Sequence, residues 1–243
     1  MSAQSANSPP TANRILKQLP PEEYERLSPH LEPVTLSHGD VLYYPQEPVS
    51  HVYFPNSGTV SVIATFADGG GIEVGVVGNE GVFGINVVLG SVTTPHEALV
   101  QQPGDCVRVS SEVLRREFKQ GGQLQDLLLR YTQAFIVQIA QTAACNKVHP
   151  LDGRLARWLL MTCDRATGQE LELTHEFMAV MLGTRRAGVT EAAGRLQDTG
   201  LISYRRGRVT ILDHRGLEAV SCECYPVVKK EFERLLGVNG QAT

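Results

Sequence analysis

Residues 173–212 read LTHEFMAVMLGTRRAGVTEAAGRLQDTGLISYRRGRVTIL. This stretch predicts a short helix that begins after Thr174, whose hydroxyl can cap the first turn. Gly183 suits the left-handed turn that ends such a helix. Thr184 is then the expected cap of a second helix over Arg185–Thr199. Two short helices joined by a glycine-containing turn indicate a helix-turn-helix.

The end of the same stretch predicts a β-hairpin with a basic tip. Two runs of strand-forming residues, Leu201–Tyr204 and Arg208–Leu212, flank Arg205-Arg206-Gly207. A hairpin at this place is the wing of a winged helix. The N-terminal end of the second helix would fit the DNA major groove, where arginine donates two hydrogen bonds to guanine and glutamate accepts one from cytosine.

Positive charge is concentrated at this end of the chain. The 243 residues have a formal net charge of −4, but residues 1–150 hold nine Lys and Arg against fourteen Asp and Glu, whereas residues 151–243 hold thirteen against twelve. Residues 183–208 contain six arginines and two acidic residues. Phosphate binding depends on such a local patch rather than on the total charge. The cap, turn, basic helix end and basic wing follow one another in the order of a DNA-binding domain. This order favours a domain that binds double-stranded DNA over a structural domain with a solvated charged face.

The first half of the chain has the pattern of a small antiparallel β domain. Short runs of Val, Ile, Tyr and Phe alternate with turn signals such as Asp68-Gly69-Gly70-Gly71, and Gly81–Leu89 interrupts the series with a segment that could hold a short helix. Regularly spaced short strands are typical of a sandwich or barrel. The expected strands are Val34–Leu36, Val41–Tyr44, Val52–Phe54, Thr59–Phe66, Gly71–Val77, Glu97–Gln101 and Cys106–Val109.

A long helix is expected to connect the two halves. Gln123–Val148, which is stopped by Pro150, is the longest uninterrupted helical pattern and would extend roughly 40 Å. Its apolar surface is wider than one stripe, so we expect one face to pack on the β domain and another on the same helix of a second copy. A helix buried inside a monomer is the alternative. The residues expected at this homodimer interface are Leu124, Leu128, Tyr131, Phe135 and Ile139.

The expected fold class is therefore α+β: an antiparallel sandwich or barrel, a long dimerisation helix and a C-terminal winged helix-turn-helix. The corresponding boundaries are a disordered tail (1–13), the β domain (14–120), the dimerisation helix (121–149) and the DNA-binding domain (150–243). The start of the chain has neither the charge nor the apolar run of a signal peptide, and no segment approaches the roughly 20 apolar residues of a membrane span. We expect a cytoplasmic protein with no membrane partner.

The motif Leu182-Gly183-x-Arg185-Arg186, followed by Gly200-Leu201-Ile202 and a basic wing, closely resembles the Crp/Fnr family of bacterial transcription regulators. The resemblance extends over nearly the whole chain. It implies that the β domain (14–120) is a cyclic-nucleotide-binding-like β-roll or jelly roll that acts as a sensor domain, followed by a dimerisation helix and a winged helix. It implies a homodimer on a near-palindromic operator, and RNA polymerase is a further partner if the protein activates transcription. The family's base-reading positions correspond here to Arg186, Ala187, Thr190 and Glu191. The helix starts, the basic second helix and the basic wing predict further DNA contacts from Thr174, Arg185, Arg195, Arg206 and Arg208.

The operator is expected to differ from those of the best-known members. In the family, the base-reading positions lie on the first two turns of the second helix. Ala187 stands where a reading glutamate is common, and Glu191 stands where an arginine is common. No motif indicates whether the protein activates or represses.

The resemblance is weaker in the β-roll. Members that bind a cyclic nucleotide present Gly-Glu to the ribose and Arg-Ser/Thr to the cyclic phosphate, whereas here Ile85 replaces the acid and His96 or its neighbours replace the arginine. A phosphate would face no permanent cation, and Glu97 would repel it. We therefore do not expect cyclic AMP in the usual mode; another small-molecule effector and an effector-independent regulator are the alternatives. The effector pocket would consist of Gly81, Val82, Phe83, Gly84, Ile85, Asn86, Thr93, Thr94 and His96.

Catalytic and metal sites are not expected. The seven histidines form no His-x-His or close His/Glu set, and the Gly-x-Ser-x-Gly and phosphate-loop motifs are missing. Cys222-Glu223-Cys224 is the only close pair among five cysteines, and no second Cys or His pair lies nearby in the sequence with a suitable spacing. We therefore predict no enzyme, no metal and no certain cofactor, and assign no role to Cys222 and Cys224. A ligand-binding module without DNA contact is the remaining alternative, and salt-dependent DNA binding would separate the two.

Overall fold

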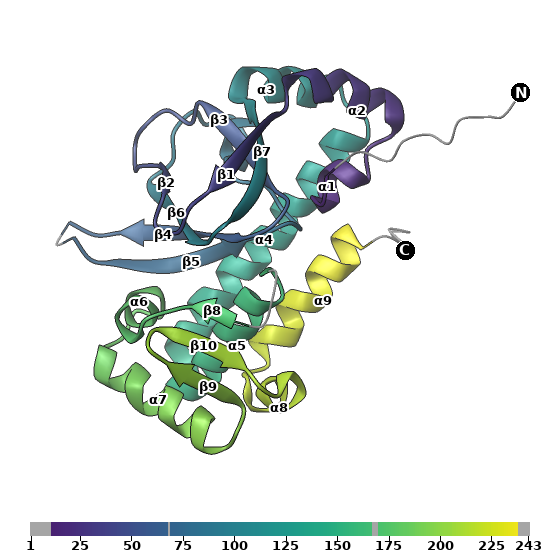
Figure 1. Cartoon of the computed structure of the whole chain (residues 1–243). Helices are drawn as coiled ribbons and strands as arrows, with labels where there is room; N and C mark the ends of the chain where they lie inside the picture. The colour runs from purple at the N-terminus through teal and green to yellow at the C-terminus, as the bar shows by residue number, and fades with distance from the viewer. Residues whose placement is uncertain (1–10, 68, 167–169, 238–243) are drawn as a thin grey trace, which may run out of the picture.

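The computed structural model describes residues 11–67, 69–166 and 170–237. A β-roll and a winged helix lie at opposite ends of one long helix (Figure 1). Buried side chains of both parts belong to one continuous hydrophobic core. The winged helix is thus packed against the β-roll and is not a separate domain joined to it only by a flexible linker.

The β-roll consists of two antiparallel sheets, with the strand orders β1-β7-β3 and β2-β6-β4-β5. Every strand expected in this half is present, and each of its ends lies within two residues of the prediction, because alternation and turn residues together define a strand. The strands are β1 (Glu32–Leu36), β2 (Val41–Tyr43), β3 (His51–Pro55), β4 (Thr59–Thr65), β5 (Gly71–Val77), β6 (His96–Gln102) and β7 (Gly104–Ser110).

Short helices cover the ends of the roll, and the end of the expected disordered tail is fixed on it. Thr11 Oγ1 donates a hydrogen bond to Asn56 Oδ1 at 2.6 Å, and buried Asn13 caps the first helix while its Nδ2 donates to the carbonyls of Pro55 and Gly81. The prediction of disorder is therefore wrong for residues 11–13, because composition carries no information on such distant partners; residues 1–10 lie outside the described part. The helices are α1 (Arg14–Lys17), α2 (Pro21–Leu27), η1 (Ser28–His30), η2 (Ile85–Val87) and α3 (Ser111–Lys119).

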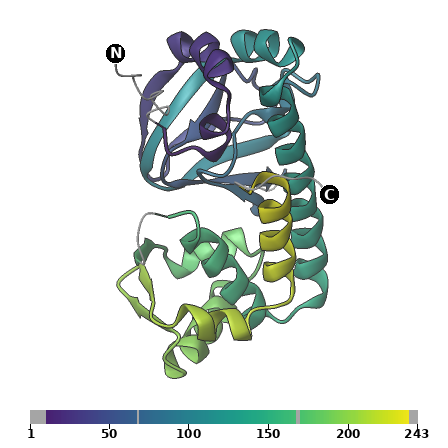
Figure 2. The ribbon, with the colours of Figure 1, turned by 90° about the vertical axis from the view of Figure 1, so that its right-hand side faces the viewer.

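Helix α4 (Gln123–Val148) has the predicted bounds and is covered on two sides by its own chain. Two glycines let its aromatic side chains lie directly on the roll, since a Cβ on Gly81 would come within 2.3 Å of the Tyr131 ring and one on Gly75 within 2.7 Å of the Phe135 ring. On another side, helix α9 (Cys224–Leu236) runs along α4 (Figure 2). Within the described residues, we find no helix with the length and hydrophobicity that a membrane span needs.

The residues expected at the dimer interface do not share one exposed face. Leu124, Leu128 and Tyr131 are each at most 3% exposed within the single chain, so they leave no surface for a second copy and their assignment is wrong. Consecutive leucines point in several directions, and the sequence pattern did not separate these directions. The large exposed apolar side chains in the body of α4 are Leu129 and Ile136, which lie seven residues apart and are 47% and 54% exposed.

The winged helix is built on α5 and on a three-stranded sheet of order β8-β10-β9. The first strand of this sheet begins at Glu170 and was not expected from the sequence; residues 167–169 lie outside the described part. The elements are α5 (Leu151–Cys163), β8 (Glu170–Glu172), α6 (His175–Met181), α7 (Arg186–Asp198), β9 (Ile202–Arg205), β10 (Arg208–Ile211) and α8 (His214–Val220).

Buried polar contacts connect the two parts. Glu73 of β5 accepts hydrogen bonds from Ser61 Oγ at 2.6 Å and from Trp158 Nε1 of α5 at 2.9 Å. Arg165 pairs with Glu80 at 2.6 Å, and both side chains are less than a tenth exposed. A buried polar group that loses its partner costs about 1–3 kcal/mol, and more if it is charged. The winged helix therefore cannot rotate away from the roll without a substantial loss of stability.

Glu73 predicts a specific pH dependence of stability. Burial raises the pKa of its carboxyl from 4.5 to about 7. Between these values the unfolded chain has lost the proton that the folded chain retains, so stability falls as the pH rises through this window and changes no further above it. Glu73→Gln keeps an acceptor for Trp158 and does not titrate. We expect the Tm of the wild type to fall relative to this variant between about pH 4.5 and about pH 7, and to change no further relative to it at higher pH.

Thermal unfolding followed by circular dichroism across this pH range measures the difference. The exposed Glu47→Gln variant is the matched control and should follow the wild type. Parallel Tm curves for the wild type and Glu73→Gln would show that Glu73 does not carry the assigned shift.

Candidate nucleic-acid interface

The helix-turn-helix forms as the local signals predict, except at the second cap. Thr174 Oγ1 accepts a hydrogen bond from the Phe177 amide at 3.1 Å, and Gly183 has a left-handed backbone with φ of +57°. The sequence predicts Thr184 as the N-cap of α7, but the N-cap is Arg185. The amide of Thr184 instead donates to the carbonyl of Ala179, which extends the turn by one residue.

The predicted base-reading residues form one exposed face at the start of α7. Arg186, Ala187, Thr190 and Glu191 are all exposed, and Arg185 at the cap is exposed as well. The opposite face is buried and consists of Val189, Ala192, Ala193 and Leu196. Arg186 lies 4.0 Å from Glu176, and both side chains are more than 70% exposed, so this pair adds little stability. The guanidinium is therefore free to exchange Glu176 for a base.

His175 holds the two helices and the wing together, which the sequence analysis did not identify. Its ring stacks on Tyr204 of β9 with centroids 4.0 Å apart, and its Nδ1 lies 2.9 Å from Thr190 Oγ1. Burial is the main cause that lowers the pKa of His175, and the charge of Arg186 adds to it. A neutral ring keeps positive charge from accumulating next to Arg186. The only available signal in the sequence was a histidine at the first position of the helix.

The wing tip is a two-residue turn. Arg206 and Gly207 both have left-handed backbones, with φ of +50° and +79°, as in the hairpin turns that match the strand twist. Arg206 is exposed at the tip, whereas Arg208 is paired with Glu170 at 3.0 Å and with Glu172 at 3.2 Å. Strand β8 therefore places two carboxylates on one of the two wing arginines predicted to contact DNA.

Arg195, also expected at the DNA, faces a carboxylate at the other end of α7. Its Nε and Nη2 donate to the two oxygens of Asp152 at 2.7 and 2.6 Å, and the pair ties α7 to α5. Arg154, on α5, donates to the carbonyl of Leu182 just before the turn. These two arginines orient the helix-turn-helix, so Arg195 has a structural role in this conformation.

The β-roll touches the helix-turn-helix at its turn. A Cβ on Gly183 would come within 2.4 Å of Ile72 Cδ1 on β5. The His38 ring, in the loop after β1, lies 6.0 Å from that of Phe177 on α6. A displacement of the β4–β5 hairpin would therefore shift the turn that precedes α7.

The residues expected in the effector pocket serve partly as core. Val82 and Phe83 are 1% exposed, and Phe83 exchanges two backbone hydrogen bonds with Tyr53 at 2.9 and 3.1 Å. Asn86 Nδ2 donates to the carbonyls of Ser91 and Thr93, both at 3.1 Å, which closes the loop on itself. The other predicted pocket residues, Gly81, Gly84, Ile85, Thr94 and His96, lie on the same loop and on the start of β6 or just before it.

His96 is the only one of the predicted pocket residues that can become positively charged. Burial lowers its pKa, which favours the neutral ring. An anionic phosphate would therefore meet no fixed positive charge from these residues.

The cysteines near the C-terminus are not isolated. The sequence showed no second pair beside Cys222 and Cys224, but Cys145 and His149 at the end of α4 lie next to them, with all four ligand atoms within 4.8 Å of one another. The premise of the no-metal prediction is therefore wrong. The missed signal was a Cys-x₃-His spacing on a helix, which places both side chains on one face.

Two family models match the chain. The Crp-like helix-turn-helix domain matches residues 153–220, and the cyclic nucleotide-binding domain matches residues 33–120. The first match includes the helix-turn-helix, the wing and α8. The second includes β1 to β7 and α3.

Curated relatives include global nitrogen regulators of cyanobacteria. The one from Nostoc sp. is 24% identical over 187 residues, which cover 73% of this chain and 83% of the relative. The one from Synechocystis sp. is 24% identical over 201 residues, which cover 77% of this chain and 89% of the relative.

Solved structures share the fold. A transcriptional regulator of the Crp/Fnr family from Eubacterium rectale aligns with a TM-score of 0.67 at 19% identity, covering 85% of this chain and 96% of that one. FixK2 from Bradyrhizobium japonicum aligns with a TM-score of 0.68 at 16% identity, covering 79% and 98%.

The contact between Gly183 and Ile72 predicts a position-dependent cost of alanine. Gly200 also has a left-handed backbone, but no atom lies within 4 Å of its virtual Cβ, so Gly200→Ala should cost only about 1–2 kcal/mol for the backbone. Gly183→Ala should cost more, because the methyl also collides with Ile72 Cδ1. Urea denaturation of both variants measures the free energies of unfolding.

Ile72→Val removes Cδ1 and provides the matched background. In that background, Gly183→Ala should cost about as much as Gly200→Ala. An equal cost of the two alanines in the wild-type background would mean that Ile72 Cδ1 moves aside without cost and that the contact does not constrain position 183.

Proposed function

We propose that the chain, which belongs to the Crp/Fnr family of DNA-binding transcription regulators, binds a near-palindromic operator as a homodimer. The members of this family are regulators and not enzymes. We further propose that an effector at the β-roll changes its DNA affinity. The observation that carries the proposal is the exposed face of Arg186, Ala187, Thr190 and Glu191 at the start of α7, beside a basic wing tip.

Base reading is supported by the chemistry of that face. Arg186 carries the planar donors that match guanine, and Glu191 carries an acceptor for the cytosine amino group. Ala187 offers a methyl group for an apolar contact with thymine. Arg206 at the wing tip and Thr174 at the start of α6 would hold phosphates, which position the helix without specifying sequence.

Dimerisation is supported by the uncovered side of α4. The β-roll and α9 already cover two sides, and the third carries Leu129, Ile136, Ala140 and Ala143. The four residues recur at intervals of three, four and seven, so they form one stripe along the helix. A second copy related by two-fold symmetry would cover this stripe with the same stripe of its own. Two α7 helices would then face half-sites about one DNA turn, roughly 34 Å, apart.

Effector control is supported by the direct contact between the two parts of the chain. Glu73 and Glu80 of the roll bond to Trp158 and Arg165 of the winged helix, so a shift in the roll changes partners at the DNA-binding end. A ligand shifts such an equilibrium only by its difference in affinity for the two arrangements. The absence of a fixed cation among the predicted pocket residues favours an effector other than cyclic AMP.

Selection of binding sites from random DNA by the purified protein, with no ligand added and over a salt series, tests the function. We expect a two-fold symmetric site and an affinity that falls with salt. Arg186→Ala should relax the preference at one base pair per half-site, with a loss of about 1–3 kcal/mol of discrimination. Arg206→Ala should instead weaken all sequences alike and reduce the salt slope by about one contact per chain.

Fluorescence anisotropy with the selected site and with single-base variants separates these effects. Lys230→Ala on α9, away from the predicted interface, is the control for a general loss of charge. An unchanged preference in Arg186→Ala would show that α7 does not read the operator. Enrichment of no site, with or without cell extract, would contradict the DNA-binding proposal itself.

The α4 stripe predicts the oligomeric state. The wild type should sediment at twice the 26.5 kDa of one chain. Ile136→Lys places a charge in the stripe and should raise the dissociation constant at least tenfold, because an unpaired charge is costly in an apolar interface. Sedimentation equilibrium measures this constant. Leu89→Lys, at a side chain that is 51% exposed on the β-roll, is the matched control and should remain a dimer. A dimeric Ile136→Lys variant would place the interface elsewhere.

A further inference from the structure

Three thiols and one imidazole converge where α4 ends and α9 begins. Cys145 and His149 come from the last turn of α4 and its C-cap, Cys222 from the segment before α9, and Cys224 from the first position of that helix. The Sγ atoms of Cys145 and Cys222 are 3.4 Å apart, and Cys224 Sγ is 3.4 Å from His149 Nδ1. The three cysteines are at most 8% exposed and form a small buried cluster of their own.

Two of these separations are close to those around one tetrahedral ion. Zinc binds sulfur at about 2.3 Å and nitrogen at about 2.0–2.1 Å, so two tetrahedral sulfurs lie about 3.8 Å apart and a sulfur and a nitrogen about 3.5 Å apart. The two measured separations are within a few tenths of an ångström of these values, and the remaining ones do not exceed 4.8 Å. Four ligands with no open position define a structural site rather than a catalytic one.

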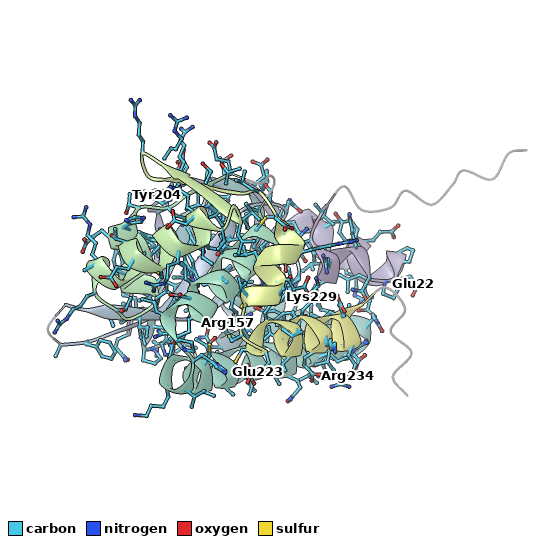
Figure 3. The ribbon with its side chains drawn as sticks, turned by 90° about the horizontal axis from the view of Figure 1, so that it is seen from below. Glu22, Arg157, Tyr204, Glu223, Lys229 and Arg234 are labelled. Carbon is cyan, nitrogen blue, oxygen red and sulfur yellow. The ribbon has the colours of Figure 1, made fainter. Side chains whose placement is uncertain are left out.

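The imidazole is already oriented as a ligand. With Nδ1 directed at the thiols, the other ring nitrogen, Nε2, lies 3.1 Å from Glu223 Oε1. Metal-binding histidines almost always donate this second N–H to a carboxylate or carbonyl, which fixes the ring and the tautomer. Gln141 Nε2 donates to Cys224 Sγ at 3.1 Å, a hydrogen bond that stabilises a thiolate. Glu223 and Arg157 both lie near this junction (Figure 3).

A buried guanidinium supplies compensating charge. Three thiolates and one Zn²⁺ carry a net charge of −1. Arg157 is 3% exposed, it donates to Thr142 Oγ1 at 3.3 Å and to Met161 Sδ at 3.4 Å, and its charge acts on the thiols of Cys145 and Cys222. Its charge also acts on Glu73, whose raised pKa favours the neutral acid. A buried cation is costly without a nearby anion, and the metal-thiolate centre would provide one.

We propose that Cys145, His149, Cys222 and Cys224 bind one Zn²⁺ ion in a closed tetrahedral site that fastens α9 and the winged helix to the end of α4. Binding displaces the protons of three thiols to solvent and involves no change of oxidation state. The site lies next to His149 and Pro150, the two residues that connect α4 to α5. A filled site therefore restrains the angle between the dimerisation helix and the winged helix. The binding of zinc at this site does not depend on the proposed binding of DNA.

Metal content of the full chain, expressed in zinc-supplemented medium, tests the site. We expect one zinc per chain in the wild type and in Cys163→Ser, a cysteine outside the cluster, and a loss of zinc in Cys145→Ser and Cys224→Ser. Cobalt added to zinc-free wild type should produce the visible absorption of tetrahedral thiolate Co²⁺. Glu223→Gln should keep the four ligands and weaken zinc about 10–100-fold in a competition with a chromogenic chelator.

The wild type alone decides the case if the cysteine variants fail to fold. Removal of zinc by a chelator should lower its Tm, and added Zn²⁺ should restore it, because an ion that binds only the folded chain stabilises it by mass action. A metal-free protein that gives no cobalt spectrum would overturn the proposal. So would a Cys145–Cys222 disulfide in the protein as isolated, detected by mass spectrometry, because the two thiolates would then be lost as ligands.

Discussion

Helix α4 has more apolar surface than a single side of the β-roll can cover, and the rest of the molecule is arranged around this constraint. Gly75 and Gly81 remove side chains from the roll so that Phe135 and Tyr131 can approach its backbone. Helix α9 returns along the chain to cover a second side. The stripe of Leu129 and Ile136 remains exposed, and it is the surface that we propose for the second copy. Because α4 extends from the β-roll to the winged helix, whatever packs on it contacts an element shared by both parts.

The coupling between the two halves is made of polar contacts inside an apolar core. Glu73 with Trp158 and Glu80 with Arg165 have strict geometry, so a small displacement breaks a bond instead of being absorbed by soft packing. Hydrophobic contacts alone would allow the winged helix to slide. This combination of a shared core and directional bonds suits a protein that changes between a few discrete arrangements.

Local signals predicted most of the fold. The bounds of α4 and β5 agree with those predicted, since Pro150, glycine-rich turns and alternating side chains are signals that lie within a few residues of each other. Features that depend on distant partners were not predicted: Asn13 fixed by Pro55 and Gly81, strand β8, and the buried state of Leu124 and Tyr131.

The same distinction applies to the candidate site. The exposed face of α7 follows from helical periodicity, whereas the carboxylates opposite Arg195 and Arg208 lie about 40 residues away in sequence. The cysteine cluster joins residues 77 positions apart. The Cys-x₃-His spacing on α4 and the Cys-x-Cys pair are each visible in the sequence, but only the fold shows that the two lie together.

The pairing of Arg208 with Glu170 and Glu172 also bears on how a regulator searches a genome. DNA phosphates must compete with two carboxylates for the guanidinium of Arg208. The wing therefore adds less affinity for random DNA than its number of arginines suggests. Because random sites outnumber operators by many orders of magnitude, the time a regulator spends on them limits how fast it finds its target. In the proposed complex, the acidic strand β8 would therefore lower the affinity for random DNA, while the exposed face of α7 would remain available for the correct bases.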